Sequence, residues 1–165
     1  MEPINIIELK NNYLKQAEKL ANKVFSDEDS LPSKELRAST SELAFNKYKS
    51  RYDNDIKELT YFVAIDNKKV VGLIGLYSTV CDFQDTSWIG WYCVDPKQRG
   101  KGIGKNLIDF AINKAKSEGK KYLSLYTSTD ESERASQIVY EKYAFYITHT
   151  QKESGYDLLF RKKIL

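Results

Sequence analysis

The stretch Tyr92–Gly119, YCVDPKQRGKGIGKNLIDFAINKAKSEG, decides the fold. It opens at the end of an apolar, strand-like run and closes on the amphipathic pattern of a helix. Between the two lie three glycines, Gly100, Gly102 and Gly104, interleaved with basic residues. Glycine lets backbone N–H groups converge on a ligand, and a helix N-terminus adds unpaired N–H groups and partial positive charge. The corner therefore predicts a site for a phosphate or a pyrophosphate.

Two common phosphate-binding motifs do not match this corner. A Walker A loop needs four residues between its first glycine and a Gly-Lys-Ser/Thr, whereas Gly104 and Lys105 are followed by Asn106 and stand too close to Gly100. A dinucleotide fingerprint needs Gly-x-Gly-x-x-Gly at the start of a domain, whereas this corner lies late in the chain. The alternative to a ligand site is a tight turn that its lysines keep soluble.

Outward from the corner, strand-like and helix-like patterns follow in an order that is neither alternating βαβ nor all-β. The expected strands are 4–8, 59–66, 70–80, 86–94, 122–129, 146–151 and 156–162, and the expected helices are 13–24, 36–47, 103–118 and 130–143. This order predicts an α+β fold with a mixed, mostly antiparallel sheet of about seven strands and about four helices. No linker-like segment divides the chain, so residues 1–165 are expected to form a single domain.

The composition is that of a soluble globular domain. Of the 165 residues, 41% are hydrophobic and 30% are charged. No apolar run approaches the ~18–20 residues that a membrane span needs, and the N-terminus lacks the features of a signal or transit peptide. A cytoplasmic protein with no membrane partner is expected.

The polar residues narrow the chemistry further. One histidine, His149, and two cysteines, Cys81 and Cys93, leave too few ligands for a zinc site, so no metal is expected. Cys93 has no plausible histidine partner, which argues against an acyl-cysteine nucleophile. Basic and acidic residues are interleaved at a net charge of +3, which argues against a module that binds nucleic acid.

Two motifs together identify a family. The pattern Arg99-x-x-Gly102-x-Gly104, after a strand that ends in Val-Asp-Pro, resembles the acyl-CoA loop of the GNAT superfamily of N-acyltransferases. About 40 residues later, Ser136–Phe145, SQIVYEKYAF, is similar to that family's segment A-x-x-x-Y-E-K-x-G-F. The inferred order of strands and helices over the whole chain is also the order of that family.

The chain departs from the family pattern at three positions. Ser136 replaces a small alanine, and Ala144 replaces the glycine before Phe145, so the turn there must accept a Cβ. Glu133 stands where many members have an asparagine near the pantetheine arm, so that contact is not implied for this chain. None of these departures touches the glycine corner or Tyr140.

The resemblance implies acetyl-CoA as co-substrate and a sheet that is splayed between the fourth and fifth strands. The pantetheine arm would pair with exposed backbone in the gap, like an added strand. The cofactor-binding residues it implies are Tyr92, Cys93 and Val94 for the arm, and Arg99, Gly100, Lys101, Gly102, Ile103, Gly104 and Lys105 for the pyrophosphate.

The implied reaction is direct attack of a primary amine on the thioester. A backbone N–H near Tyr92 or Cys93 would stabilise the developing oxyanion, and Tyr140 would protonate the departing thiolate as general acid. The base that deprotonates the amine stays open between Glu42, Asp82, Asp85 and water.

The acceptor also stays open between a small-molecule amine and a peptide amine, and the protein between a monomer and a homodimer. An acidic stretch, Ser26–Ser30, would suit a cationic acceptor, although a solvated turn also explains it. By strand parity, Trp88 and Trp91 fall on opposite faces, one in the core and one beside the acceptor. The competing function is a non-catalytic acyl-CoA sensor, against which Tyr140 argues because a sensor needs no acid.

Overall fold

The computed structural model describes residues 4–25 and 31–165, so the acidic stretch 26–30 lies outside the described residues. Seven strands form one sheet in the order β1-β2-β3-β4-β5-β7-β6. They are β1 (Asn5–Glu8), β2 (Ile56–Asp66), β3 (Lys69–Thr79), β4 (Thr86–Val94), β5 (Tyr122–Ser128), β6 (Tyr146–Lys152) and β7 (Asp157–Ile164). The helices of the described chain are α1 (Asn11–Val24), α2 (Leu31–Ala38), α3 (Glu42–Tyr52), α4 (Ile103–Ser117) and α5 (Arg134–Lys142). This confirms the predicted α+β architecture.

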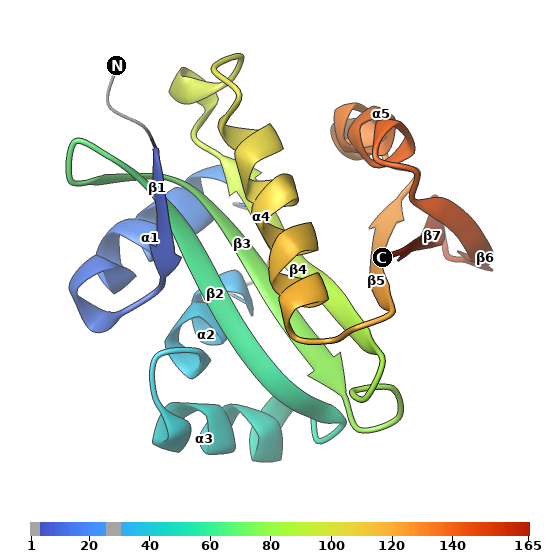
Figure 1. Ribbon diagram of the computed structural model, residues 1–165, viewed down its shortest axis with the longest axis horizontal. Helices are drawn as coiled ribbons and strands as arrows, with labels where there is room; N and C mark the ends of the chain where they lie inside the picture. The colour runs from blue at the N-terminus through green and yellow to red at the C-terminus, as the bar shows by residue number, and fades with distance from the viewer. Residues whose placement is uncertain (1–3, 26–30) are drawn as a thin grey trace.

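The sheet is antiparallel except where β4 meets β5. These two strands are parallel and pair only from Thr86 opposite Tyr122 to Trp88 opposite Ser124. Beyond that point they diverge, which confirms the splay between the fourth and fifth strands (Figure 1). The splay leaves β5, β7, β6 and α5 as one half of the molecule beside β1–β4 and α4.

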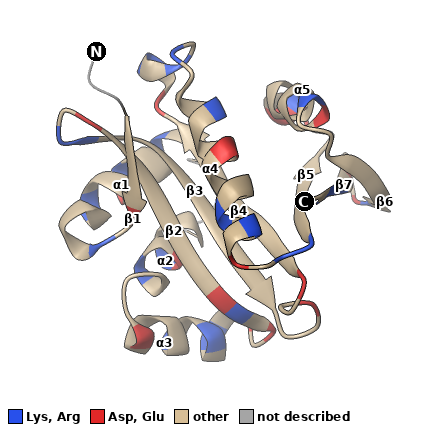
Figure 2. Cartoon of the chain, viewed as in Figure 1, with Lys and Arg blue, Asp and Glu red and all other residues tan. Residues whose placement is uncertain are grey.

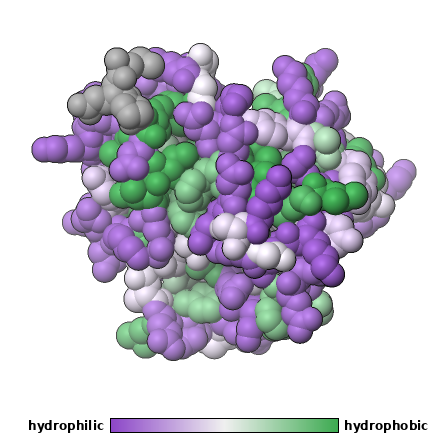
Figure 3. All heavy atoms as spheres, viewed as in Figure 1, coloured by the Kyte–Doolittle hydropathy of each residue, from purple (hydrophilic) through white to green (hydrophobic). Residues whose placement is uncertain are grey.

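The helices cover both faces of the sheet. In Figure 1, α4 lies in front of the sheet and α1, α2 and α3 lie behind it. One core packs between the sheet and α4, with Leu107, Ile108 and Ala111 fully buried, and the other packs against α1–α3 around Tyr61. Figure 3 shows the α4 side, where the polar outer surface of α4 runs between two groups of hydrophobic residues.

The single helix expected over 36–47 is wrong, because the chain forms two helices there, α2 and α3. The break falls at a run of three hydroxyl residues. Ser39 Oγ donates to Leu36 O at 2.9 Å and Thr40 Oγ1 donates to Arg37 O at 2.7 Å, while Ser41 Oγ caps α3 by accepting from the N–H of Ala44 at 3.2 Å. These local hydrogen bonds compete with the helix backbone and stop it.

The parity prediction for the two tryptophans is also wrong, because β4 contains a β-bulge. Tyr92 pairs with Ile74 and Ile89 pairs with Leu76, so two residues of β4, Gly90 and Trp91, oppose one residue of β3. The extra residue reverses the alternation of side chains. Trp88 and Trp91 therefore lie on the same face, the one that α1–α3 cover.

A Schellman motif fixes the end of α5. The N–H of Phe145 donates to Tyr140 O, and the N–H of Ala144 donates to Glu141 O, both at 3.0 Å. The rings of Tyr140 and Phe145 then meet edge to face at 5.8 Å. Ala144 occupies the left-handed position with φ of 60°, as its place in the motif demands.

Replacing Ala144 with glycine is expected to raise the free energy of unfolding by about 0.5–1 kcal/mol. A Cβ in the left-handed region costs roughly 1–2 kcal/mol, and the greater freedom of glycine in the unfolded chain removes only part of that gain. Urea titration measures the change. Ala135→Gly, at an exposed position inside the same helix, is the matched control and should lower stability by about 0.5–1 kcal/mol. Equal destabilisation by both variants would contradict the expected relief of strain.

Candidate active site

The open edge of β4 is the first part of the site. Within the described chain, no strand pairs with the β5-facing edge of β4 beyond Trp88. Tyr92, Cys93 and Val94 lie along this stretch, and their other edge pairs with β3. Their backbone is thus available to a ligand that enters the splay.

The Cys93 side chain does not face a reactive environment. It is buried in the core beneath α1–α3. Burial raises the pKa of the thiol to about 12, so at neutral pH it is protonated and a poor nucleophile. The position agrees with a packing role for the side chain, while the β5-facing edge of the backbone has no partner strand among the described residues.

The glycine corner joins a short 3-10 helix, Pro96–Gln98, to α4. Gly100 and Gly102 have φ of 79° and 80°, and a Cβ at either would meet no atom within 4 Å. The backbone conformation, and not lack of space, therefore requires glycine. Within the described residues, the N–H groups of 99–105 have no hydrogen-bond acceptor, and the first helical bond runs from Asn106 to Gly102 at 3.0 Å.

Basic side chains surround these free N–H groups. Arg99, Lys101 and Lys105 are all exposed, and Figure 2 shows basic residues at the end of the molecule where α4 begins. Lys101 Nζ donates to Gln98 Oε1 at 2.7 Å, and Lys105 Nζ pairs with an Asp109 carboxylate oxygen at 2.8 Å. Such exposed contacts are weak and leave the cations available to an anion.

Gly104 has a packing role that the sequence did not reveal. A Cβ there would lie 2.6 Å from the Tyr92 hydroxyl. The glycine thus lets the Tyr92 ring cross from β4 onto the first turn of α4. Burial raises the pKa of Tyr92 to about 12, so its phenol is protonated at neutral pH.

Tyr140 lies on α5, across the splay from β4. Its side chain is 5% exposed and belongs to the core on the α4 side. No group among the described residues forms a hydrogen bond with its hydroxyl. Burial raises the pKa of Tyr140 well above its ordinary value, and Tyr92 and Glu133 add to the rise. The phenol therefore keeps a proton that it can donate.

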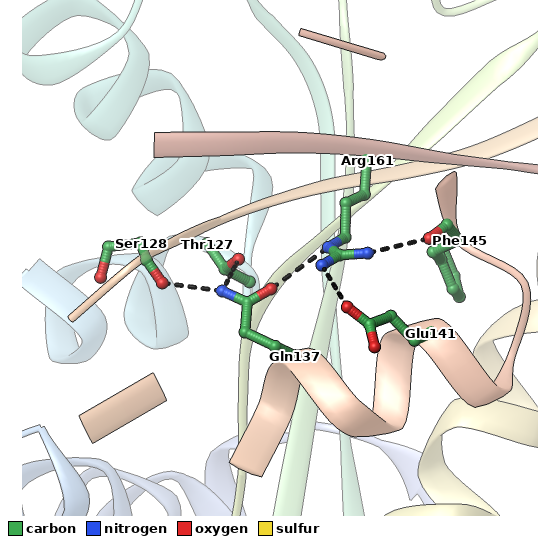
Figure 4. Close-up of polar contacts among 6 residues, drawn as sticks. All are labelled: Thr127, Ser128, Gln137, Glu141, Phe145 and Arg161. Atoms are coloured by element: carbon green, nitrogen blue, oxygen red, sulfur yellow. Dashed lines mark hydrogen bonds and ion pairs between the residues drawn. The ribbon is translucent and has the colours of Figure 1, made fainter. Parts of the chain in front are cut away.

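A buried arginine anchors α5 to β7 (Figure 4). Arg161 is 3% exposed and donates to Phe145 O at 3.1 Å, Gln137 Oε1 at 3.2 Å and Glu141 Oε1 at 3.2 Å. Gln137 in turn donates to Thr127 Oγ1 at 2.6 Å and to a backbone oxygen of β5. These contacts hold the helix that carries Tyr140 at a fixed place.

The three carboxylates considered as bases are placed differently. Asp82 accepts from Thr79 Oγ1 at 2.7 Å and from Trp88 Nε1 at 2.8 Å, and Asp85 accepts from Thr86 Oγ1 at 3.0 Å. Glu42 lines a hollow of about 690 Å³ near the C-terminal end of α4, which neither Tyr140 nor any of the predicted cofactor-binding residues lines. Glu133, the departure from the family pattern, accepts from the N–H of Ser128 at the end of β5.

Glu35 is a further carboxylate of the candidate site, and the sequence did not reveal it. It lies half-buried on α2 and accepts hydrogen bonds from the hydroxyls of Tyr48 at 3.1 Å and Tyr61 at 2.8 Å. Burial raises the pKa of Glu35, and hydrogen bonds from Tyr61, Tyr48 and the Trp91 side chain oppose the rise. No signal in the sequence marks it, because its partners come from α3 and β2.

Two kinds of feature are absent from the described ranges. Across residues 4–25 and 31–165, no three His, Cys, Asp or Glu side chains gather in a way that could hold a metal ion. None of the helices described is long and apolar enough to cross a membrane.

The comparisons with known proteins agree with this geometry. The model of the acetyltransferase (GNAT) family matches residues 28–145. The chain is similar to the solved structure of an N-acetyltransferase from Staphylococcus aureus Mu50, with 22% sequence identity, 99% of each chain covered and a TM-score of 0.73. It is also similar to a GNAT family acetyltransferase from Elizabethkingia anophelis with acetyl-CoA bound, with 21% identity, 100% of each chain covered and a TM-score of 0.67. A third similar structure is an aminoglycoside 6'-N-acetyltransferase from Enterococcus faecium, with 15% identity, 97% of this chain and 96% of that chain covered and a TM-score of 0.72. A search of curated proteins finds no significant match. Because the family model spans well over half of the chain, the protein belongs to the GNAT family of acetyltransferases.

Proposed function

We propose that the protein transfers an acetyl group from acetyl-CoA to a primary amine. The observation that carries the proposal is the open backbone edge of β4 next to the free N–H groups of 99–105. Main-chain groups of Tyr92, Cys93 and Val94 would hold the pantetheine arm, and residues 99–105 would hold the pyrophosphate. The acetyl-CoA bound to the Elizabethkingia relative supports this choice of co-substrate.

The chain supplies an acid for the reaction. As the amine nitrogen bonds to the thioester carbon, the carbon–sulfur bond breaks and the sulfur needs a proton, which the Tyr140 hydroxyl would donate. A backbone N–H near Tyr92 or Cys93 would stabilise the charge on the carbonyl oxygen. A non-catalytic sensor would need no such acid, and Tyr140 is the residue that separates the two functions.

A thermal-shift experiment with acetyl-CoA, ATP and NAD tests the proposal. Acetyl-CoA at about a hundred times its Kd should stabilise the wild type by roughly 2.7 kcal/mol, while ATP and NAD should not. Arg99→Glu should lose most of the shift because it adds negative charge beside the pyrophosphate site. Lys152→Glu, an exposed charge reversal on β6, is the matched control and should keep the shift.

Release of the CoA thiol in the presence of amines then distinguishes an enzyme from a sensor. Stabilisation by acetyl-CoA with no turnover on any amine would favour the sensor. Stabilisation by ATP or NAD alone would overturn the assignment of the glycine corner.

A further inference from the structure

A carboxylate without a basic partner lies behind the sheet, next to the splay. Among the described residues, no lysine, arginine or histidine forms an ion pair with Glu35. Its two oxygens are held by neutral groups, the phenols of Tyr48 and Tyr61 and the indole of Trp91. A buried charge held only by neutral groups is costly, and a bound cation would lower that cost. A positively charged ligand could therefore form an ion pair with Glu35.

Glu35 is connected to the bulge of β4 through a single hydroxyl. The Tyr61 hydroxyl donates to Glu35 and accepts from the N–H of Trp91 at 3.3 Å. At Gly90, a Cβ would lie 3.2 Å from the same hydroxyl and 3.6 Å from the Tyr77 ring. The carboxylate, the bulge and the Tyr77 ring therefore form one contiguous group on the face that α1–α3 cover.

Aromatic rings continue from this group across the apex of the splay. The rings of Tyr77 and Trp88 stack at 6.1 Å with an interplanar angle of 22°. Trp88 is paired with Ser124 at the last contact between β4 and β5. Two residues further along β5 on the same face is Tyr126, which is 53% exposed and lies 5.5 Å from the Phe160 ring.

The hydroxyl of Ser124, at the last contact between β4 and β5, has no hydrogen-bond partner among the described residues. Ser124 is 1% exposed, and its Oγ forms no hydrogen bond with any described residue. Leu123 and Leu125 face the α4 side, so the Ser124 hydroxyl points to the face of Trp88 and Tyr126. An unsatisfied buried hydroxyl calls for an explanation, and a ligand that reaches the apex from this face supplies one.

We propose, resting on the acetyl transfer proposed above, that this face binds the acceptor and that the acceptor is a primary amine on an aromatic or other apolar skeleton. Glu35 binds the ammonium group, and the rings of Tyr77, Trp88, Trp91 and Tyr126 contact the skeleton. Aromatic faces attract ammonium groups and also contribute apolar area, so both parts of the ligand are matched.

A polycation fits this group less well, because among the described residues only two carboxylates, Glu35 and Asp82, form hydrogen bonds with it. Asp82 is held by Thr79 and Trp88. Asp53 accepts from the N–H of Asp55 at 3.0 Å, just after α3 ends. A ligand with several ammonium groups would leave most of them facing rings instead of carboxylates.

The test compares amines of the two classes on the intact protein by release of the CoA thiol. The probes are 2-phenylethylamine and tryptamine against spermidine and kanamycin. We expect kcat/KM to be at least tenfold higher for the first pair. Glu35→Gln should raise KM for 2-phenylethylamine at least tenfold, and Tyr126→Ala should raise it about fivefold. Asp66→Asn, at the turn between β2 and β3, and Ile138→Ala, exposed on α5 at the opposite face of the sheet, are the control variants and should leave KM unchanged.

Direct titration of 2-phenylethylamine into each variant gives a readout besides turnover, and the acetyl-CoA thermal shift shows that each variant is folded. Preference for spermidine or kanamycin, or a KM that Glu35→Gln and Tyr126→Ala leave unchanged, overturns this inference while acetyl transfer stands. If acetyl-CoA does not stabilise the wild type, the proposed function is overturned, and this inference is overturned with it.

Discussion

Replacing Tyr140 with phenylalanine is expected to lower kcat about 10²- to 10⁴-fold, the usual contribution of a general acid. The ring still fills its place against Phe145, so the free energy of unfolding and the acetyl-CoA thermal shift should change little. Stopped-flow or steady-state thiol release measures kcat. Tyr143→Phe is the matched control, since that hydroxyl donates to Asp109 on the surface of α4 at 2.9 Å. Equal loss of kcat in both variants would show that Tyr140 has no special role.

The pH profile adds an independent check on Tyr140. Burial raises the pKa of Tyr140, so the protonated, donating form persists to higher pH than in a free tyrosine. The wild-type kcat should therefore show no loss attributable to Tyr140 up to about pH 10, the ordinary value for a phenol. An alkaline decline well below that pH, present in the wild type and absent from Tyr140→Phe, would mean that the phenol ionises early.

Replacing Arg161 with methionine should lower the free energy of unfolding by about 2–4 kcal/mol. The change leaves the buried Phe145 carbonyl and the Gln137 amide oxygen without their donor, at roughly 1–3 kcal/mol each. Urea titration measures the loss. Because Arg161 fixes α5, kcat should also fall while the acetyl-CoA shift, which depends on the glycine corner, persists.

Arg134→Met is the control for the arginine change. Arg134 begins α5, is 75% exposed and pairs with Glu131 at 3.2 Å. A surface ion pair of this kind contributes little, so stability should change by less than about 0.5 kcal/mol. Similar small losses in both variants would mean that the Arg161 contacts do not anchor the helix.

Local patterns predicted the parts of the site that depend on neighbouring residues. Gly100 and Gly102 lie in a turn directly before α4, as the sequence predicted, and the segment ending at Phe145 forms the turn that follows Tyr140. These features depend on a few consecutive residues, so the sequence contains the information needed to find them.

Features that arise from packing could not be predicted in the same way. The bulge at Gly90 and Trp91 reversed the expected face of a tryptophan, because register depends on the partner strand β3. Glu35 meets Tyr48 and Tyr61 only after α2, α3 and β2 come together. Arg161 is followed by two lysines in β7, and nothing in the sequence sets it apart from them. The break between α2 and α3 was local, but three hydroxyl residues compete with a helix less visibly than a proline does.

The open edge of β4 has a consequence for how such a protein can change over time. A backbone edge offers the same N–H and C=O groups whatever side chains it carries, so a ligand held there places little demand on residue identity. Substitutions along β4 and its neighbours can accumulate provided that the divergence from β5 survives. The Enterococcus structure shares only 15% of its residues with this chain and yet superimposes with a TM-score of 0.72. Selection on such a fold acts on the spacing between β4 and β5 more than on the identity of the residues in these strands.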